Sequence, residues 1–122
     1  MTSKWIMGTA LAVLLPGHAL AAPDLANGKR VFARCSACHG AAGQGTAMAP
    51  ALRMVVGRKA GSIQGFAYSD AMRNTGVSWT ETQLSAFLQH PQQVVKGTRM
   101  AFPGLPDDKD RSDLIGYLKT LK

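Results

Sequence analysis

Apolar residues recur every three or four positions in three stretches of the chain, which is the spacing of one buried helix face. These stretches predict a first helix from about Asp24 to the cysteines at 35 and 38, a second over 80–90 and a third over 107–121. No stretch sustains an alternation of apolar and polar residues, so the sequence predicts a mostly helical fold. The side chains predicted to face inward are Leu25, Gly28, Val31 and Phe32, then Leu84, Phe87 and Leu88, and finally Leu114, Tyr117, Leu118 and Leu121.

Polar and turn-forming residues predict where the helices begin and end. Thr80 opens a T-E-T-Q sequence that resembles a capping box, and Pro91 should end the helix that follows. Ser69 should cap a short helix, DAMRNT, that Gly76 ends. Residues 40–68 and 96–106 are rich in glycine and other loop-forming residues, so we expect loops there. The first of these loops is unusually long, which indicates that it wraps around something.

The first 21 residues have the layout of a removable secretory signal peptide. Lys4 supplies positive charge, residues 6–15 are apolar and uncharged, and the His-Ala-Leu-Ala sequence at 18–21 provides an A-x-A site. The apolar stretch is too short to span a bilayer, which takes about 20 residues. The alternatives are an uncleaved anchor or a buried core helix. Cleavage after Ala21 would divide the chain into a signal peptide, 1–21, and a mature domain, 22–122.

The charge balance of the chain points to an acidic partner. Lys and Arg number 14 against 7 Asp and Glu, a formal net charge of +7, and removal of Lys4 with the signal leaves 13 against 7, or +6. Such a charge favours an acidic protein surface, a membrane surface or nucleic acid. Export argues against nucleic acid, and the chain has no nucleic-acid-binding motif. A mature domain this short buries a modest core and often needs a staple, a metal or a cofactor.

Residues 35–39 read Cys-Ser-Ala-Cys-His, and C-x-x-C-H is the attachment signature of c-type haem. Thiols one helical turn apart suit the two vinyl groups on one porphyrin edge, and the adjacent His39 imidazole would reach the iron from the proximal side. The alternatives are a structural disulfide between Cys35 and Cys38, a thioredoxin-type dithiol and a zinc site. A dithiol motif is expected near a βαβ pattern, and a zinc site needs four ligands. We therefore predict one haem c, bound covalently through Cys35 and Cys38.

The sixth ligand of the iron decides what such a haem does. A methionine or histidine there gives electron transfer, whereas an open site permits a haem enzyme or a gas sensor. His90 precedes a proline at a helix end and is expected at the surface. Met100 lies in a flexible loop between two helices, which favours it as the distal ligand. The candidates are His90, Met48, Met54, Met72 and Met100.

Several motifs, in order, resemble those of class I c-type cytochromes, closest to mitochondrial cytochrome c and its soluble bacterial relatives. They cover nearly the whole mature chain, from about Gly28 to Lys119. The resemblance implies the cytochrome c fold, which is all-α with three main helices plus short helices and loops wrapping one covalently bound haem. The matching segments are GKRVFARCSACH, APAL, GRKAGSIQGFAYSDAMRNTGVSW, GTRMAFPG and RSDLIGYLK.

The resemblance also implies roles for individual residues. His39 is implied as the proximal ligand and Met100 as the distal ligand. Pro50 matches a proline whose carbonyl accepts a hydrogen bond from the proximal imidazole. The remaining matches are Arg58, Tyr68 and Trp79, which would hold the haem propionates, Thr98, near the ligating sulfur, and Phe102, beside the haem near the docking surface.

These expectations predict a monomeric periplasmic electron carrier of a respiratory or photosynthetic chain, not an enzyme. Its donor would be a quinol-oxidising complex or a periplasmic dehydrogenase, and its acceptor an oxidase or a reaction centre, with only peripheral membrane contact. The alternative to a free carrier is a dedicated electron-transfer subunit of one dehydrogenase. Basic residues flank the cofactor-binding segments and would steer acidic docking surfaces toward the haem edge, unless they are simply solvated surface. These residues are Arg34, Arg53, Lys96 and Arg99.

Overall fold

The computed structural model describes residues 1–3, 5, 8–14 and 21–122. The residues it describes contain helices joined by long loops, with one isolated antiparallel bridge between Lys59 and Ser78 in place of a sheet. The prediction of an all-α fold is therefore confirmed. The helices are α1 (Leu25–His39), α2 (Asp70–Asn74), α3 (Glu81–Gln89), α4 (Pro91–Val94) and α5 (Asp108–Leu118).

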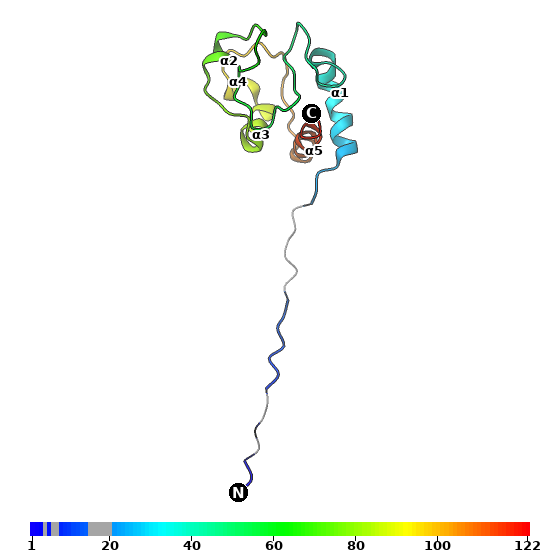
Figure 1. Cartoon of the computed structure of the whole chain (residues 1–122), viewed down its shortest axis with the longest axis vertical. Helices are drawn as coiled ribbons and strands as arrows, with labels where there is room; N and C mark the ends of the chain where they lie inside the picture. Colours follow the sequence, from blue (N-terminus) through cyan, green and yellow to red (C-terminus); the bar gives the residue numbers. More distant parts are fainter. Residues whose placement is uncertain (4, 6–7, 15–20) are drawn as a thin grey trace.

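Helices α1 and α5 lie side by side and form the main helix pair of the body (Figure 1). Helix α3 packs against both α4 and α5, and α2 lies on the same side of the body as α3 and α4 (Figure 1). Their apolar faces enclose one core, to which the loops also contribute. The buried members of this core are Val31, Phe32, Val55, Ala60, Trp79, Leu84, Phe87, Leu88, Val95, Leu105, Leu114, Ile115 and Leu118.

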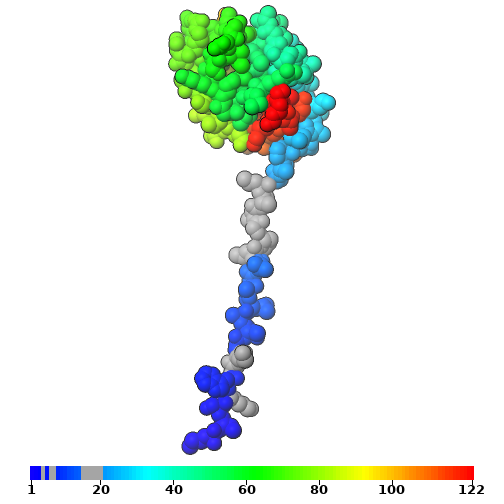
Figure 2. All heavy atoms as spheres, viewed as in Figure 1, coloured from blue at the N-terminus to red at the C-terminus, as the bar shows by residue number. Residues whose placement is uncertain are grey.

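Much of the predicted signal peptide falls on residues 4, 6–7 and 15–20, which lie outside the described part of the chain. The described residues between 1 and 14 are exposed and stand away from the body (Figure 2). Among the described residues, no helix is both long enough and apolar enough to cross a membrane. The signal peptide and its cleavage after Ala21 stay predictions.

Local capping sets the ends of α1. The Asp24 carboxylate accepts a hydrogen bond from the Asn27 N–H at 3.0 Å, which satisfies a donor that the first turn leaves free. Gly40 ends the helix with φ of 91°, a conformation that glycine adopts without strain. The predicted inward face is correct except at Leu25, which is 46% exposed. Leu25 lies in the first turn, at the edge of the contact with α5, where neighbours cover only part of its side chain.

The crossing of α1 and α5 depends on Gly28. A Cβ atom added there would lie 2.1 Å from the carbonyl oxygen of Asp113 and 2.8 Å from the Cβ of Tyr117, so only glycine lets the two backbones approach this closely. One turn further along α1, the rings of Phe32 and Tyr117 pack with their centroids 5.2 Å apart. The crossing therefore fixes the position of the helix that carries the C-x-x-C-H motif.

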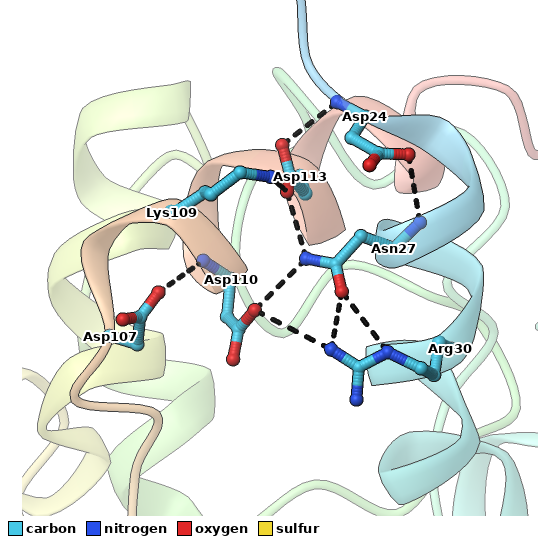
Figure 3. A network of polar contacts seen from close by, with 7 residues as sticks. All are labelled: Asp24, Asn27, Arg30, Asp107, Lys109, Asp110 and Asp113. Atoms are coloured by element: carbon cyan, nitrogen blue, oxygen red, sulfur yellow. Dashed lines mark hydrogen bonds and ion pairs between the residues drawn. The ribbon is translucent and has the colours of Figure 1, made fainter.

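A network of hydrogen bonds connects the N-terminal parts of the same two helices (Figure 3). The buried carboxylate of Asp113 accepts hydrogen bonds from the Asp24 N–H at 2.8 Å, from Asn27 Nδ2 at 2.8 Å and from Lys109 Nζ. The hydrogen bond from Lys109, followed by those from Asn27 and Asp24, stabilises the charged carboxylate and lowers the pKa of Asp113 to about 2. Asn27 Nδ2 also donates to Asp110 at 2.9 Å, so one amide joins two acidic residues of α5, Asp110 and Asp113, to α1.

The sequence predicted the start of α3 correctly and missed α4. Thr80 Oγ1 accepts from the Gln83 N–H at 3.2 Å, as in a capping box. The Thr80 N–H itself donates to the Ser78 carbonyl, so the reciprocal half of the box is taken by the backbone. Pro91 ends α3, as expected, but it is also the first residue of α4. A proline suits that place because the first turn of a helix leaves its N–H groups unpaired in any case.

The short helix α2 and the connecting loops follow the turn chemistry of the sequence. Ser69 Oγ accepts from the Met72 N–H at 3.1 Å and caps α2. The helix ends at Asn74, before Gly76, whose φ of 70° turns the chain away. Residues 40–68 form no helix, as predicted. Segment 96–106 is likewise a loop, which leads from α4 to α5.

Candidate haem-binding site

A cavity of about 540 Å³ lies between α1, α3, α5 and the loops, with an apolar lining for the most part. Its volume falls in the range of roughly 300–1,000 Å³ that is usual for ligand and cofactor sites. The structure brings every residue predicted at the site to this one cavity. Those residues are Cys35, Cys38, His39, Pro50, Arg58, Tyr68, Trp79, Thr98, Met100 and Phe102.

The last turns of α1 place the C-x-x-C-H motif on one wall. Cys35 is half-buried and Cys38 exposed, and both are free thiols in this structure, so the disulfide alternative has no support. Burial, the dominant influence, raises the pKa of the Cys35 thiol. Because neither thiol is paired, both sulfur atoms are available to a group bound in the cavity.

The His39 imidazole is buried and held in one orientation. Its Nδ1 lies 2.7 Å from the carbonyl oxygen of Pro50, and because a carbonyl can only accept, Nδ1 carries the hydrogen. Burial is the largest influence on the pKa of His39 and lowers it, which favours the neutral imidazole. With Nδ1 protonated, the free lone pair is on Nε2, the arrangement of a metal-ligating histidine with an oriented ring.

The loop after α4 brings Met100 to the same cavity. Thr98 is buried, and its Oγ1 accepts from the Met100 N–H at 3.3 Å. The loop then meets the end of α3 so closely that a Cβ atom at Gly104, where φ is 116°, would lie 2.2 Å from the Gln89 carbonyl oxygen. Of the other sequence candidates for the sixth ligand, Met48 and Met72 line the cavity, whereas Met54 and His90 do not. The structure thus reduces five candidates to three.

A half-buried cationic group, that of Arg58, lies at the cavity wall. The half-buried Arg58 guanidinium donates to the carbonyl oxygens of Ala51 at 2.7 Å and Arg53 at 3.0 Å. None of the ion pairs among the described residues involves Arg58. Burial lowers the pKa of Arg58, so the cation is incompletely compensated by the chain and suits an anionic ligand. Tyr68, whose hydroxyl accepts from the Ile63 N–H at 3.1 Å, also lines the cavity.

Aromatic side chains complete the enclosure. Trp79 is buried and packs on Phe87 with ring centroids 4.8 Å apart. Phe102 is half-buried, and the guanidinium carbon of Arg34 lies 5.2 Å from its ring centroid, which joins α1 to the Met100 loop. Of the basic residues predicted to flank the cofactor, Arg34 and Arg99 line the cavity; Arg53 and Lys96 do not.

Sequence reasoning assigned some of the cavity wall to the core alone. Helical periodicity correctly placed these side chains on inward faces, but periodicity does not distinguish a face packed on protein from one packed on a cofactor. The residues concerned are Leu84, Leu88, Leu114 and Leu118.

The residues present fit a covalently attached haem. One wall offers two thiols and an oriented imidazole, and most of the lining is apolar. The Arg58 cation, which has no carboxylate partner among the described residues, would suit an acidic substituent of the haem. A zinc site has no comparable support, because no three His, Cys, Asp or Glu side chains gather within the part of the chain that the structure describes.

Comparisons with known proteins agree with this geometry. The family model for cytochrome c matches residues 25–122. A cytochrome c from Tetrahymena pyriformis is 52% identical over 99 residues, covering 80% of this chain and 89% of that protein. A cytochrome c2 from Rhodoblastus acidophilus is 44% identical over 96 residues, covering 78% of this chain and 90% of that protein.

A solved structure shows the same fold. Cytochrome cH from Methylobacterium extorquens superposes with a TM-score of 0.75 at 43% identity, and the match covers 80% of this chain and 98% of that one. Together with the C-x-x-C-H spacing on the cavity wall, these matches establish both the family and the cofactor. The chain belongs to the cytochrome c family of electron-transfer proteins and binds one haem c covalently through Cys35 and Cys38.

Proposed function

We propose that this cytochrome is a monomeric, non-enzymatic periplasmic electron carrier whose haem iron is ligated by His39 and Met100. The observation that carries the proposal is that an oriented, buried imidazole and the Met100 loop line the same cavity. When bound, the haem supplies a one-electron redox centre. A thioether ligand together with an imidazole ligand would stabilise the ferrous form and raise the reduction potential.

Residues of the protein restrain the His39 ligand and exclude water from this centre. The Pro50 carbonyl fixes the His39 ring and maintains its ligating tautomer. The buried side chains of Trp79 and Phe87 exclude water from the wall of the cavity. Because the chain holds both His39 and the Met100 loop, little rearrangement would oppose the gain or loss of an electron.

Exposed basic residues supply a docking surface for an acidic redox partner. Arg34 and Arg99 are exposed, and both line the cavity, so their charge is concentrated where the cofactor is held. Charges in this place would speed the encounter with an acidic surface and orient it toward the haem. The donors that fit are a quinol-oxidising complex or a periplasmic dehydrogenase, and the acceptors are an oxidase or a reaction centre.

Visible spectroscopy of the ferric protein tests the axial ligands. A thioether on ferric haem gives a weak far-red band, which we expect in the wild type and in Met48→Leu and Met72→Leu, and which Met100→Ala should abolish. The two control positions also line the cavity, so they report general disturbance of the site. A wild-type protein without the band would contradict the proposal and favour an open sixth site, as in a haem enzyme or sensor.

Export is tested separately. The intact mass of the haem-loaded protein from the periplasmic fraction should correspond to residues 22–122 plus one haem. Retention of residues 1–21 would contradict cleavage after Ala21, and recovery in the cytoplasmic fraction would contradict export. Co-purification with a dehydrogenase in fixed stoichiometry would favour the dedicated subunit over the free carrier.

A further inference from the structure

The exposed side chain of Gln92, in the short helix α4, reaches the loop that carries Met100. Gln92 Nε2 donates to the carbonyl oxygen of Thr98 at 2.9 Å, and Gln92 Oε1 accepts from the N–H of Gly97 at 3.2 Å. One amide group thus pairs with the backbone of two successive loop residues, neither of which lies in a helix or a strand.

This contact continues to Met100 through Thr98. The Thr98 side chain is buried, and its Oγ1 accepts from the Met100 N–H at 3.3 Å. The Thr98 N–H donates to the carbonyl of Val95 at 3.0 Å, and Val95 is 2% exposed. The amide of Gln92 therefore ties the residue that positions the Met100 backbone to α4.

The two ends of the Met100 loop are held differently. At the far end, the Leu105 N–H donates to Leu88 at 2.8 Å, and the buried Arg111 guanidinium donates to the carbonyls of Leu105 at 2.7 Å and Pro106 at 2.9 Å. At the near end, Gly97 is exposed with φ of 92°, and a Cβ atom added there would meet one atom, 3.4 Å away. The near end is the less enclosed, so its restraint depends more on the side chain of Gln92.

We propose that Gln92 is a positioning residue for the distal ligand: its amide clamps residues 97 and 98 and limits how often the Met100 sulfur leaves the iron. The proposal rests on Met100 being the distal ligand, as proposed above. Gln92 acts through Thr98 and the loop backbone, and it does not line the cavity.

The neighbouring glutamine provides a matched control. Gln93 has the same side chain, lies in the same short helix and is also exposed. Within the described residues its side chain makes no hydrogen bond, and its backbone N–H donates to the carbonyl of His90 at 3.0 Å. A substitution at Gln93 therefore repeats the change in composition and helix propensity without removing the clamp.

The first experiment measures displacement of Met100 by imidazole in the ferric, haem-loaded protein. Gln92→Met removes both hydrogen bonds while keeping a side chain of similar length, and Gln92→Glu keeps the acceptor for Gly97 but loses the donor to Thr98. A typical hydrogen bond is worth roughly a fivefold change in an equilibrium constant. We expect imidazole affinity to rise on the order of tenfold in Gln92→Met, by less in Gln92→Glu, and not at all in Gln93→Met.

The second experiment measures amide hydrogen exchange at Gly97 in the reduced protein, which does not depend on displacing Met100. Gln92→Met should accelerate this exchange and Gln93→Met should not. Unchanged Gly97 exchange would show that the clamp is absent, and faster exchange with unchanged imidazole affinity would show that it does not restrain Met100. Either result overturns the proposal.

Two further outcomes separate this proposal from others. Both Gln92→Met and Gln93→Met could lower the urea unfolding midpoint in proportion to a gain in imidazole affinity. Such a result would mean that the gain reflects general destabilisation, and it would overturn a local role for Gln92. A wild-type protein without the thioether band would overturn Met100 ligation and with it the positioning role. Gly97 exchange would still show whether the clamp exists, so the two failures remain distinguishable.

Discussion

Replacing Gly28 by alanine should force α1 and α5 apart. The added Cβ would lie 2.1 Å from the Asp113 carbonyl oxygen and 2.8 Å from its carbonyl carbon. Both atoms belong to the backbone of α5, so no side-chain rotation can relieve the overlap. The two helices would have to separate by roughly 1 Å, because protein interiors are close-packed and hold little spare volume.

The net loss of stability can be worked out from two opposing effects. Overpacking in a close-packed interior costs about 1–3 kcal/mol, and a clash between two backbones belongs near 3 kcal/mol. Alanine in place of glycine within a helix returns about 1 kcal/mol. We therefore expect Gly28→Ala to lower the free energy of unfolding by about 2 kcal/mol, which shifts the urea midpoint down by about 1 M.

Urea unfolding of the haem-loaded protein measures this loss, with Gly116→Ala as the control. A Cβ atom at Gly116, within α5, would lie 2.5 Å from the side chain of Pro23, which belongs to the exposed segment before α1 and can move. The same gain in helix propensity, about 1 kcal/mol, then applies without a backbone clash, and displacement of Pro23 offsets part of it. We therefore expect Gly116→Ala to raise the free energy of unfolding by about 0–1 kcal/mol. A Gly28→Ala midpoint at or above that of the wild type, or equal losses in both variants, would refute the reasoning.

Three other changes follow from the structure. Met54 is exposed and has a φ of 58°, so Met54→Gly should raise the free energy of unfolding by roughly 0.5 kcal/mol. Urea unfolding would measure this gain, and a loss of stability would contradict the prediction. The pKa of Asp113 falls from 3.8 to about 2 on folding, so the stability that its charged carboxylate contributes is present above pH 3.8 and is lost as the pH falls through 2. In Asp113→Asn the free energy of unfolding should therefore fall less steeply with pH in that window, and an unchanged pH profile would contradict the prediction. Arg34→Gln should slow electron transfer with an acidic partner severalfold at low salt and weaken its salt dependence, whereas an effect independent of ionic strength would rule out steering.

The sequence alone predicted the elements whose causes are local. Asp24, Thr80 and Asp107 cap their helices through hydrogen bonds to residues three positions away, so short stretches of sequence suffice to identify them. The C-x-x-C-H motif lies within about one helical turn, and its spacing alone indicated haem attachment. Met100 was favoured by its place in a loop between two helices, and the other residues predicted at the site came from resemblance to a family. The structure brings all of them to the same cavity.

Only the tertiary structure decided which distant residues meet. Periodicity placed Leu25 inside, but its exposure depends on where α5 ends its contact with α1. Proline chemistry predicted a stop at Pro91, and the same residue begins the helix from which Gln92 reaches the Met100 loop. The pairing of Arg34 with Phe102 likewise joins segments far apart in the sequence. Such contacts depend on how whole helices and loops pack, because the free energy of packing comes from surfaces that no local pattern of residues describes.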